Sequence, residues 1–310
     1  MPTLTTTNAT NVREDLGEII SMISPEETPF TTAIGKTKAT QKTHEWLQDE
    51  LAAANKDNAA AEGADAAEAT LAVPVRLSNQ AQIFTKTIAV SETFEASNTA
   101  GGKSELAKQL YKAGKEIKRD MEAAFVSDNP SVSAGVRKLG GAEAWIATNV
   151  SHGTGGATAG FSGGAVGAVT AGTTRELTED LFQNVLAGAF TDGGNITKVI
   201  APPSLKAKIG TFDGGAVKQQ MADKKTVTAG IDVYDGDFGR YDILPHRYMS
   251  TTTVIAFDES LWNQAVLRGI KKSELGKTGD AKKFQLVAEV TLECLNEAGN
   301  AKVADVTPTA

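Results

Sequence analysis

Residues 104–125 carry the strongest periodic signal in this sequence of 310 residues. Ser104 is suited to cap the first turn of a helix, and two glycines stand shortly before it. At 1.5 Å per residue such a helix is about 33 Å long, and its remaining faces carry many charged side chains. Apolar side chains recur at steps of 4, 3, 4, 4 and 3 residues along one helical face: Leu106, Leu110, Ala113, Ile117, Met121 and Ala124.

Two runs of alternating apolar residues precede this helix, and alternation is typical of half-buried strands. Ahead of them, residues 51–63 are rich in Ala, Asp, Glu and Asn and offer little to bury. We predict a long two-stranded protrusion with an Ala-rich excursion. Because two strands alone are marginally stable in water, we expect the protrusion to rest on a neighbouring subunit. The runs are Leu71, Val73, Val75 and Leu77, then Phe84, Lys86, Ile88 and Val90, with Ser78 to Gln80 between them.

The first forty residues are predicted to form an extended arm. A Thr- and Asn-rich start leads into a short amphipathic stretch from Val12 to Ile23, followed by Pro25 and Pro29. A helix over this stretch must dock on another surface, because its apolar side chains share one face. These side chains are Leu16, Ile19, Ile20 and Ile23.

The remainder of the chain mixes helices and strands, which indicates the α+β class. Residues 151–173 are rich in glycine and are predicted to be a loop. A second helix is expected to start at the capping box Thr173 to Glu176 and to end at Asp192. A strand at 197–201 and a short helix at 202–209 follow. The predicted later strands are 231–234, 241–244, 252–256, 265–268 and 284–295.

Composition and charge exclude several classes of protein. With 41% apolar and 22% charged residues the chain is globular, and its formal net charge of -7 disfavours tight sequence-independent binding to nucleic acid. Cys294 is the only cysteine, so an intrachain disulfide is impossible and synthesis in a reducing compartment is expected. The N-terminus lacks the pattern of a secretory signal, and no run of 18 apolar residues predicts a membrane span.

Several short motifs imitate cofactor or metal sites and lack their required partners. Three Gly-Lys-Ser/Thr triplets lack the upstream glycine of a phosphate loop, where Phe30, Ser97 and Lys271 stand instead. Asp237-Phe-Gly lacks the other motifs of a kinase and is expected to be a turn between strands. His44-Glu45 begins like a zinc motif, but Gln48 occupies the position of the second histidine. We therefore predict no cofactor, no metal and no catalytic site.

Three further residues have both a functional and a structural interpretation. Ser162 lies in Gly160-Phe-Ser-Gly-Gly, which imitates a nucleophile elbow, but its flanks do not predict the required strand and helix. Cys294 lies in an alternating strand and is expected to pack there. Trp46, at the base of the protrusion, is about equally suited to local packing and to anchoring a subunit contact.

Several phrases, in a shared order along the chain, resemble the SU10-type major capsid proteins of tailed bacteriophages. They include residues 24–30, 34–39, His44-Glu-Trp46 and 51–54 near the N-terminus. Residues 237–249 and 275–280 continue the resemblance, which is weakest in the Gly-rich stretch 151–173 and at the final residues.

This resemblance implies the Hong Kong 97 (HK97) capsid fold, whose parts match those predicted above. We assign residues 1–43 to the N-terminal arm and 44–90 to the extended loop. Residues 91–174 form the peripheral domain with the spine helix 104–125, residues 175–257 the axial domain, and residues 258–310 a return to the peripheral domain. Candidate contacts between subunits are Phe30, Trp46, Leu71, Val73 and Phe84.

The function that the resemblance implies is structural. The chain is expected to self-assemble into pentamers and hexamers of an icosahedral shell around phage double-stranded DNA, without sequence-specific DNA binding or membrane contact. Expected partners are copies of itself, a portal and separate scaffolding or decoration proteins, with assembly in the bacterial cytoplasm and residence in the virion capsid. The alternatives are a cellular encapsulin-like nanocompartment, which would hold a folded enzyme in place of DNA, and a serine hydrolase built around Ser162.

Overall fold

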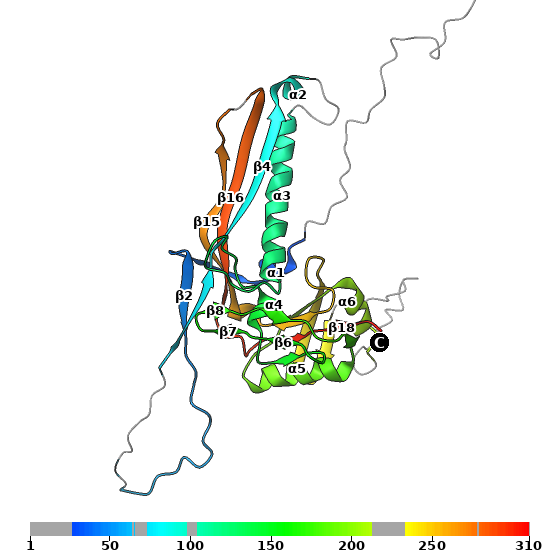
Figure 1. Cartoon of the computed structure of the whole chain (residues 1–310). Coiled ribbons are helices and arrows are strands. Elements are labelled where there is room, and N and C mark those ends of the chain that lie inside the picture. The colour runs from blue at the N-terminus through cyan, green and yellow to red at the C-terminus, as the bar shows by residue number, and fades with distance from the viewer. Residues whose placement is uncertain are drawn as a thin grey trace, which may run out of the picture.

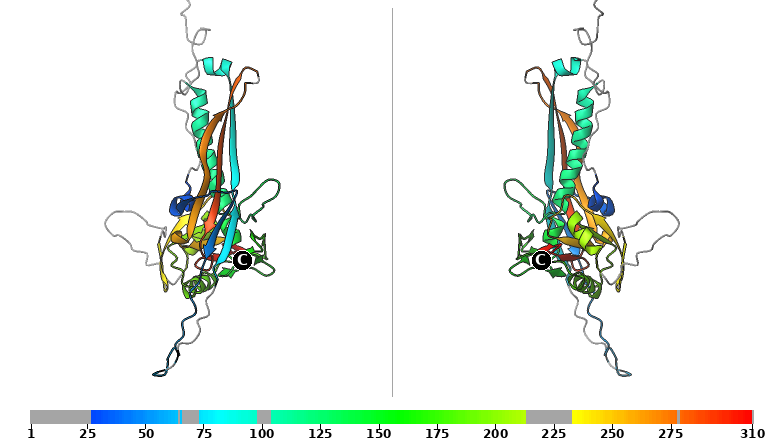
Figure 2. Two further views of the ribbon diagram at one scale, coloured as in Figure 1. Left: turned by 90° about the vertical axis from the view of Figure 1, so that its left-hand side faces the viewer. Right: turned by 90° about the vertical axis from the view of Figure 1, so that its right-hand side faces the viewer.

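The computed structural model describes residues 27–63, 65, 73–97, 104–212, 233–277 and 279–309. The molecule is elongated: a tall column, which contains the helix Glu105–Phe125 and long strands, rises from a wider body (Figures 1 and 2). The loop between strands β2 (Thr43–Gln48) and β3 (Val75–Gln80) leaves the body in the opposite direction (Figure 1).

The predicted long helix is confirmed as α3 (Glu105–Phe125), which forms the axis of the column. The Ser104 hydroxyl accepts a hydrogen bond from the Ala107 N–H at 3.2 Å and so caps the first turn. The carboxylate of Glu95 accepts a second one from the Leu106 N–H at 3.0 Å. Glu95 belongs to the short helix α2 (Glu92–Ala96). The first turn of α3 is therefore capped by Ser104 and by a side chain from α2.

A four-stranded sheet lies beside α3, in the order β1-β15-β16-β4. The helix packs along β4 and β16, and the alternating residues Phe84, Leu286 and Val290 are buried. Strand β1 runs parallel to β15, and the other neighbours are antiparallel. The strands are β1 (Gly35–Lys38), β4 (Gln82–Ser91), β15 (Trp262–Glu274) and β16 (Ala281–Cys294).

The predicted pairing of the two alternating runs is wrong. The first run, β3, pairs with β2 from Thr43↔Gln80 to Gln48↔Val75, and the second, β4, pairs with β16 along its length. Alternation reports which side chains share a face of a sheet but carries no information about the partner strand. The Ala-rich excursion is confirmed, since residues 51–63 are all exposed.

The wider body is built on a six-stranded sheet in the order β12-β13-β11-β14-β17-β5. Helices α5 (Glu179–Thr191) and α6 (Pro203–Ile209) pack with it around a core of their own that includes Phe182, Leu205 and Tyr241. The Asp237-Phe-Gly segment is the predicted turn, between β12 and β13. The strands are β5 (Val150–Ser151), β11 (Lys198–Ala201), β12 (Val233–Gly236), β13 (Gly239–Pro245), β14 (Val254–Phe257) and β17 (Ala301–Val303).

The second helix begins later than predicted. Its N-cap is Thr178, whose hydroxyl accepts from the Leu181 N–H, and not Thr173. Residues Arg175–Glu176 form strand β10 instead, paired in parallel with β18 (Val306–Thr307). Residues 173–176 match a helix-capping pattern, but Arg175 and Glu176 pair with a strand about 130 positions away instead. Tertiary contacts here override the local preference.

The Gly-rich stretch is a compact set of turns and two-residue strands over one side of the body. Strand β6 (Ala157–Thr158) pairs with β9 (Val169–Thr170), and β7 (Phe161–Ser162) pairs with β8 (Ala165–Val166). A single turn of helix, α4 (Ala142–Trp145), precedes it, and a 3-10 helix, η2 (Glu259–Leu261), connects β14 to β15.

Candidate functional site

The ribbon of β2 and β3 exposes apolar side chains beyond its root. The cross-strand pair Trp46 and Leu77 is buried, whereas Val75 and Val73 are 59% and 84% exposed further out and Leu51 is 98% exposed. Exposed apolar clusters on a projecting element are typical of a surface that binds a partner.

A hollow of about 930 Å³ lies at the root of this ribbon. Leu51, Val73 and Leu77 line it from the ribbon, and Trp145 and Phe161 line it from the body. The last two rings stack at a centroid distance of 5.4 Å. The hollow is therefore a partly aromatic surface continuous with the exposed ribbon.

Of the five contact candidates, three are buried in the core of their own chain. Phe30 is 0% exposed and lies 5.0 Å from the ring of Phe257. Trp46 donates its indole N–H to the Cys294 carbonyl at 2.8 Å, and Phe84 is buried on the sheet. These three side chains expose little surface with which to contact a neighbouring subunit. Val73 is the exposed candidate, and Leu71 lies outside the described residues.

The short helix α1 (Pro29–Ala33) is attached to helix α3 through a buried carboxylate. Glu122 of α3 accepts hydrogen bonds at 2.8 Å from the N–H groups of Phe30 and Thr31 in α1. Its Oε1 is also 2.8 Å from His246 Nε2. His246 Nδ1 accepts from two backbone N–H groups, those of Tyr248 and Met249, so Nε2 carries the proton and donates it to Glu122.

A second buried carboxylate, Asp305, organises the Gly-rich stretch. It accepts from the N–H groups of Gly153 at 3.1 Å and Gly172 at 2.9 Å, and lies 3.3 Å from His152 Nδ1. A Cβ on Gly172 would lie 2.6 Å from the Gly153 carbonyl oxygen, so glycine is required for this approach. Burial alone would raise the pKa of Asp305, but the N–H donors and His152 hold it below its usual value.

The Asp305 cluster continues inward to a buried lysine. His152 Nε2 is 3.0 Å from Thr158 Oγ1, and Lys302 Nζ donates to the same oxygen at 2.6 Å and to the Glu143 carbonyl at 2.5 Å. Burial lowers the pKa of Lys302 to about 8 and raises that of Glu143. Burial also lowers the pKa of His152, in spite of Asp305 beside it. The cluster joins the Gly-rich turns to β17 by hydrogen bonds.

Neither Ser162 nor Cys294 has the geometry of a catalytic nucleophile. Ser162 is exposed on the two-residue strand β7 and is followed by a tight turn at Gly163-Gly164, not by the helix of a nucleophile elbow. Cys294 is fully buried, and burial raises the pKa of its thiol well above the usual value. Within the described ranges, no cluster of three His, Cys, Asp or Glu side chains is placed to hold a metal ion.

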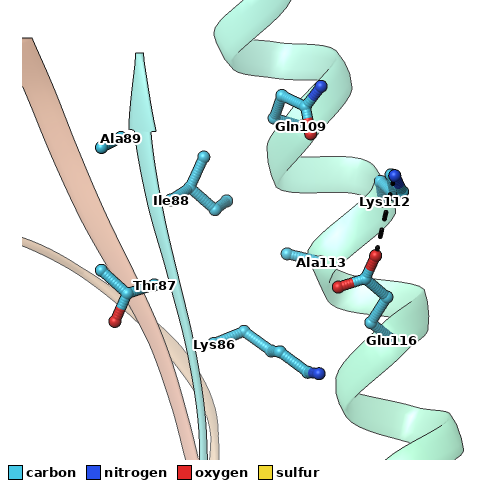
Figure 3. Close-up of a pocket in the computed structure, with 8 residues that line it drawn as sticks. All are labelled: Lys86, Thr87, Ile88, Ala89, Gln109, Lys112, Ala113 and Glu116. Carbon is cyan, nitrogen blue, oxygen red and sulfur yellow. Dashed lines mark ion pairs between the residues drawn. The ribbon is translucent and has the colours of Figure 1, made fainter.

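A narrow groove between α3 and β4 has a volume of about 260 Å³. Figure 3 shows Ile88 directed from the strand towards the helix, with the small side chain of Ala113 opposite it. Its charged rim is already paired, Lys86 with Asp120 at 2.8 Å and Lys112 with Glu116 at 4.0 Å. The groove therefore lacks the free convergent polar groups of a ligand site.

No described helix has both the length and the apolar content needed to cross a bilayer. The residues that anchor these segments were not predicted from the sequence: the buried Glu122, His246, Lys302 and Asp305, and the partly buried His152. Each depends on partners more than 90 positions away or on an unusual backbone angle, such as the φ of 59° at Asp305. The one local signal is the excess of glycine at 151–173, which indicates close backbone approach without naming the partner.

Residues 1–307 of the chain match the model of the SU10 major capsid protein family. It is 30% identical to the major capsid protein of Escherichia phage Phieco32, over 89% of each chain.

Solved structures show the same fold at low sequence identity. The capsid of the native GTA particle has a TM-score of 0.66 and 12% identity, with 98% of each chain covered. The Mycobacterium phage Bobi structure has a TM-score of 0.61 and 13% identity, covering 98% of this chain and 99% of that one. The holo-SrpI encapsulin complex of Synechococcus elongatus scores lower, at 0.53 and 10% identity over 94% and 93%, so the nanocompartment alternative is not favoured. The fold is thus the HK97-like capsid fold, and the chain belongs to the SU10 major capsid protein family.

Proposed function

We propose that this major capsid protein assembles into pentamers and hexamers of an icosahedral shell that encloses phage double-stranded DNA. The observation that carries the proposal is the exposed apolar surface of the β2–β3 ribbon, at Leu51, Val73 and Val75. Burial of apolar surface lowers the free energy by about 25 cal/mol per Å². Contact of these side chains with a second copy of the chain is therefore favourable.

The geometry of closure follows from the kind of contact. A ribbon that projects from one subunit onto a different surface of the next makes a heterologous contact, which forms a closed ring when the rotation closes. Several modest contacts per subunit then act together, so the complete shell holds its subunits far more tightly than any single contact would.

We propose the following parts of the chain. Residues 1–43 are the arm, and the extended loop ends at Gln80, because β4 belongs to the sheet of the column. Residues 81–174, which include β4, α3 and the Gly-rich turns, belong to the peripheral domain. Residues 175–257 form the axial domain, and residues 258–310 return to the peripheral domain.

We propose a purely structural role for the chain, with no catalytic activity. The net charge of -7 supports enclosure of DNA without tight binding to it, since an acidic wall releases no phosphate counterions. Other proposed partners are a portal and separate scaffolding or decoration proteins, with assembly in the host cytoplasm.

The test is assembly of the purified full-length chain, followed by negative-stain electron microscopy. Wild type is expected to form closed shells, and Val73→Asp to remain unassembled because a buried carboxylate is costly without a partner. Val73→Leu, which keeps the apolar surface, is the matched control and is expected to form shells. Normal shells from Val73→Asp would exclude the ribbon as the assembly contact, provided circular dichroism shows both variants folded.

A further inference from the structure

The helix of the column covers only part of one face of its sheet. Helix α3 packs along β4 and β16. Strands lie about 4.8 Å apart and a helix is about 10 Å wide, so one helix covers roughly two strands. Among the helices of the described residues, α3 does not extend over the half of this face formed by β15 and β1.

A groove of about 440 Å³ occupies this uncovered half, between α1, the lower part of α3 and β15. Its floor is apolar, with Ile34, Met121 and Val290 all buried, and Val266 lies beside them. At its edge Ile270 is 41% exposed. Ile270 lies between Arg268 and Lys271, in the second of two register shifts of β15 against β16, where the strand departs from regular pairing.

The N-terminal segment has the right pattern for this groove and ends beside it. Thr28 lines the groove, and the amphipathic stretch 12–23 ends five residues earlier in the sequence. Five residues span at most about 17 Å, so Ile23 is tethered within reach of the groove. As a helix, the stretch is about 18 Å long, which matches the open half of the sheet in scale.

Charge also favours this segment. Lys36 and Lys118 line the groove. The stretch carries three carboxylates, Glu14, Asp15 and Glu18, against the single cation of Arg13. Opposite charge supports docking and orients the segment, while the apolar stripe supplies the contact area.

We propose that residues 12–23 of the same chain lie in this groove as a second helix beside α3, with their apolar stripe on the sheet. The short tether gives the chain's own segment an effective concentration in the millimolar range, ahead of any second copy in dilute solution. The proposal concerns the single subunit and does not depend on shell assembly.

Disulfide trapping in the dilute, full-length subunit tests the proposal. Ile270→Cys is combined with one cysteine in the stripe, at position 16, 19, 20 or 23, or with one off it, at position 14, 18 or 21. Ser21→Cys is the closest control for Ile20→Cys, since neighbouring positions differ by about 100° around a helix. Cys294 is 0% exposed and is not expected to react.

We expect intramolecular crosslinks that form about tenfold faster from stripe positions than from off-stripe positions, because a disulfide needs Cα atoms within about 7 Å. Equal rates at all positions would show that the segment stays near the groove without docking in one orientation, and would overturn the proposal. Crosslinked dimers alone would place a second copy's segment in the groove and also overturn it.

A second measurement uses Ile270→Asp, which puts a charge at the edge of the groove. Tryptic cleavage at Arg13 is expected to accelerate about tenfold, because cleavage follows the population of the undocked segment. Tyr111→Asp, at an exposed position of α3, is the control and is expected to leave cleavage unchanged. An unchanged rate in Ile270→Asp, with thermal unfolding as in wild type, would contradict docking.

Discussion

At the scale of single residues, two buried carboxylates position chain segments that lack a core of their own. Glu122 binds the backbone of α1, and Asp305 binds the Gly-rich turns. In both cases the carboxylate accepts hydrogen bonds from two backbone N–H groups, which are costly to bury without a partner. These side chains therefore act in place of the regular backbone pairing that arms and turns lack.

Glu122→Gln tests the first of these attachments. The amide cannot accept from both N–H groups and His246 as the carboxylate does, so we expect a loss of about 2–4 kcal/mol in the free energy of unfolding. Urea unfolding of the unassembled subunit measures it. Glu116→Gln, on the same helix, loses only a part-exposed ion pair with Lys112 and should cost about 0.5 kcal/mol or less. Equal losses in the two variants would contradict a special role for Glu122.

The pKa of Lys302, lowered to about 8 by burial, predicts a pH dependence of stability. In the unfolded chain this lysine keeps its proton up to its ordinary pKa of 10.5, so between pH 8 and 10.5 the unfolded state binds more protons. Stability of wild type should therefore rise with pH across this window, relative to Lys302→Met, by on the order of 3 kcal/mol in total. Urea unfolding at several pH values measures the difference, and parallel curves for the two proteins would contradict it.

At the scale of elements, α3 supplies the column with its main apolar contact. Its buried face meets β4 and β16, while the other faces carry ion pairs that are partly open to solvent. In the described part of the chain, the column is one layer of sheet with α3 packed along it. Its stability therefore rests on few large side chains.

Ile117→Ala tests this dependence. Ile117 is 0% exposed in the middle of α3, and removing its buried methyl groups should cost about 2–5 kcal/mol because a cavity remains. Tyr111→Ala, which is 63% exposed on the same helix, should cost less than about 1 kcal/mol. Thermal unfolding of the two unassembled variants compares them. Similar losses would show that the helix is stabilised by its own propensity and not by the sheet.

At the scale of the whole molecule, the ribbon and its loop project away from both cores (Figure 1). The described part of the loop buries little surface, since residues 51–63 are exposed and the ribbon is already paired at Gln48 and Val75. A molecule of this shape buries its outlying surface on other copies, as expected for a capsid subunit.

Replacing residues 50–72 by a short Gly- and Ser-rich turn separates folding from assembly. We expect the thermal midpoint of the subunit to change by less than about 4 °C, since little buried contact is lost. Shell formation, measured by negative-stain electron microscopy, should be abolished. Closed shells from the shortened chain would show that the loop is dispensable for assembly.

Local spacing in the sequence was sufficient for α3, its Ser104 cap, the strand from Phe284 and the exposed Ala-rich loop. Helical and strand periods repeat within a few residues, so these features depend on neighbours along the chain. The resemblance of several phrases, in a shared order along the sequence, was sufficient to identify the capsid family. Only the tertiary structure decided that β3 pairs with β2 and β4 with β16, that Phe30 and Trp46 lie in the core, and that Glu122 and Asp305 receive distant N–H groups. Those outcomes depend on contacts between residues far apart in the chain, and no local pattern records which of two equally apolar surfaces a strand or ring will find.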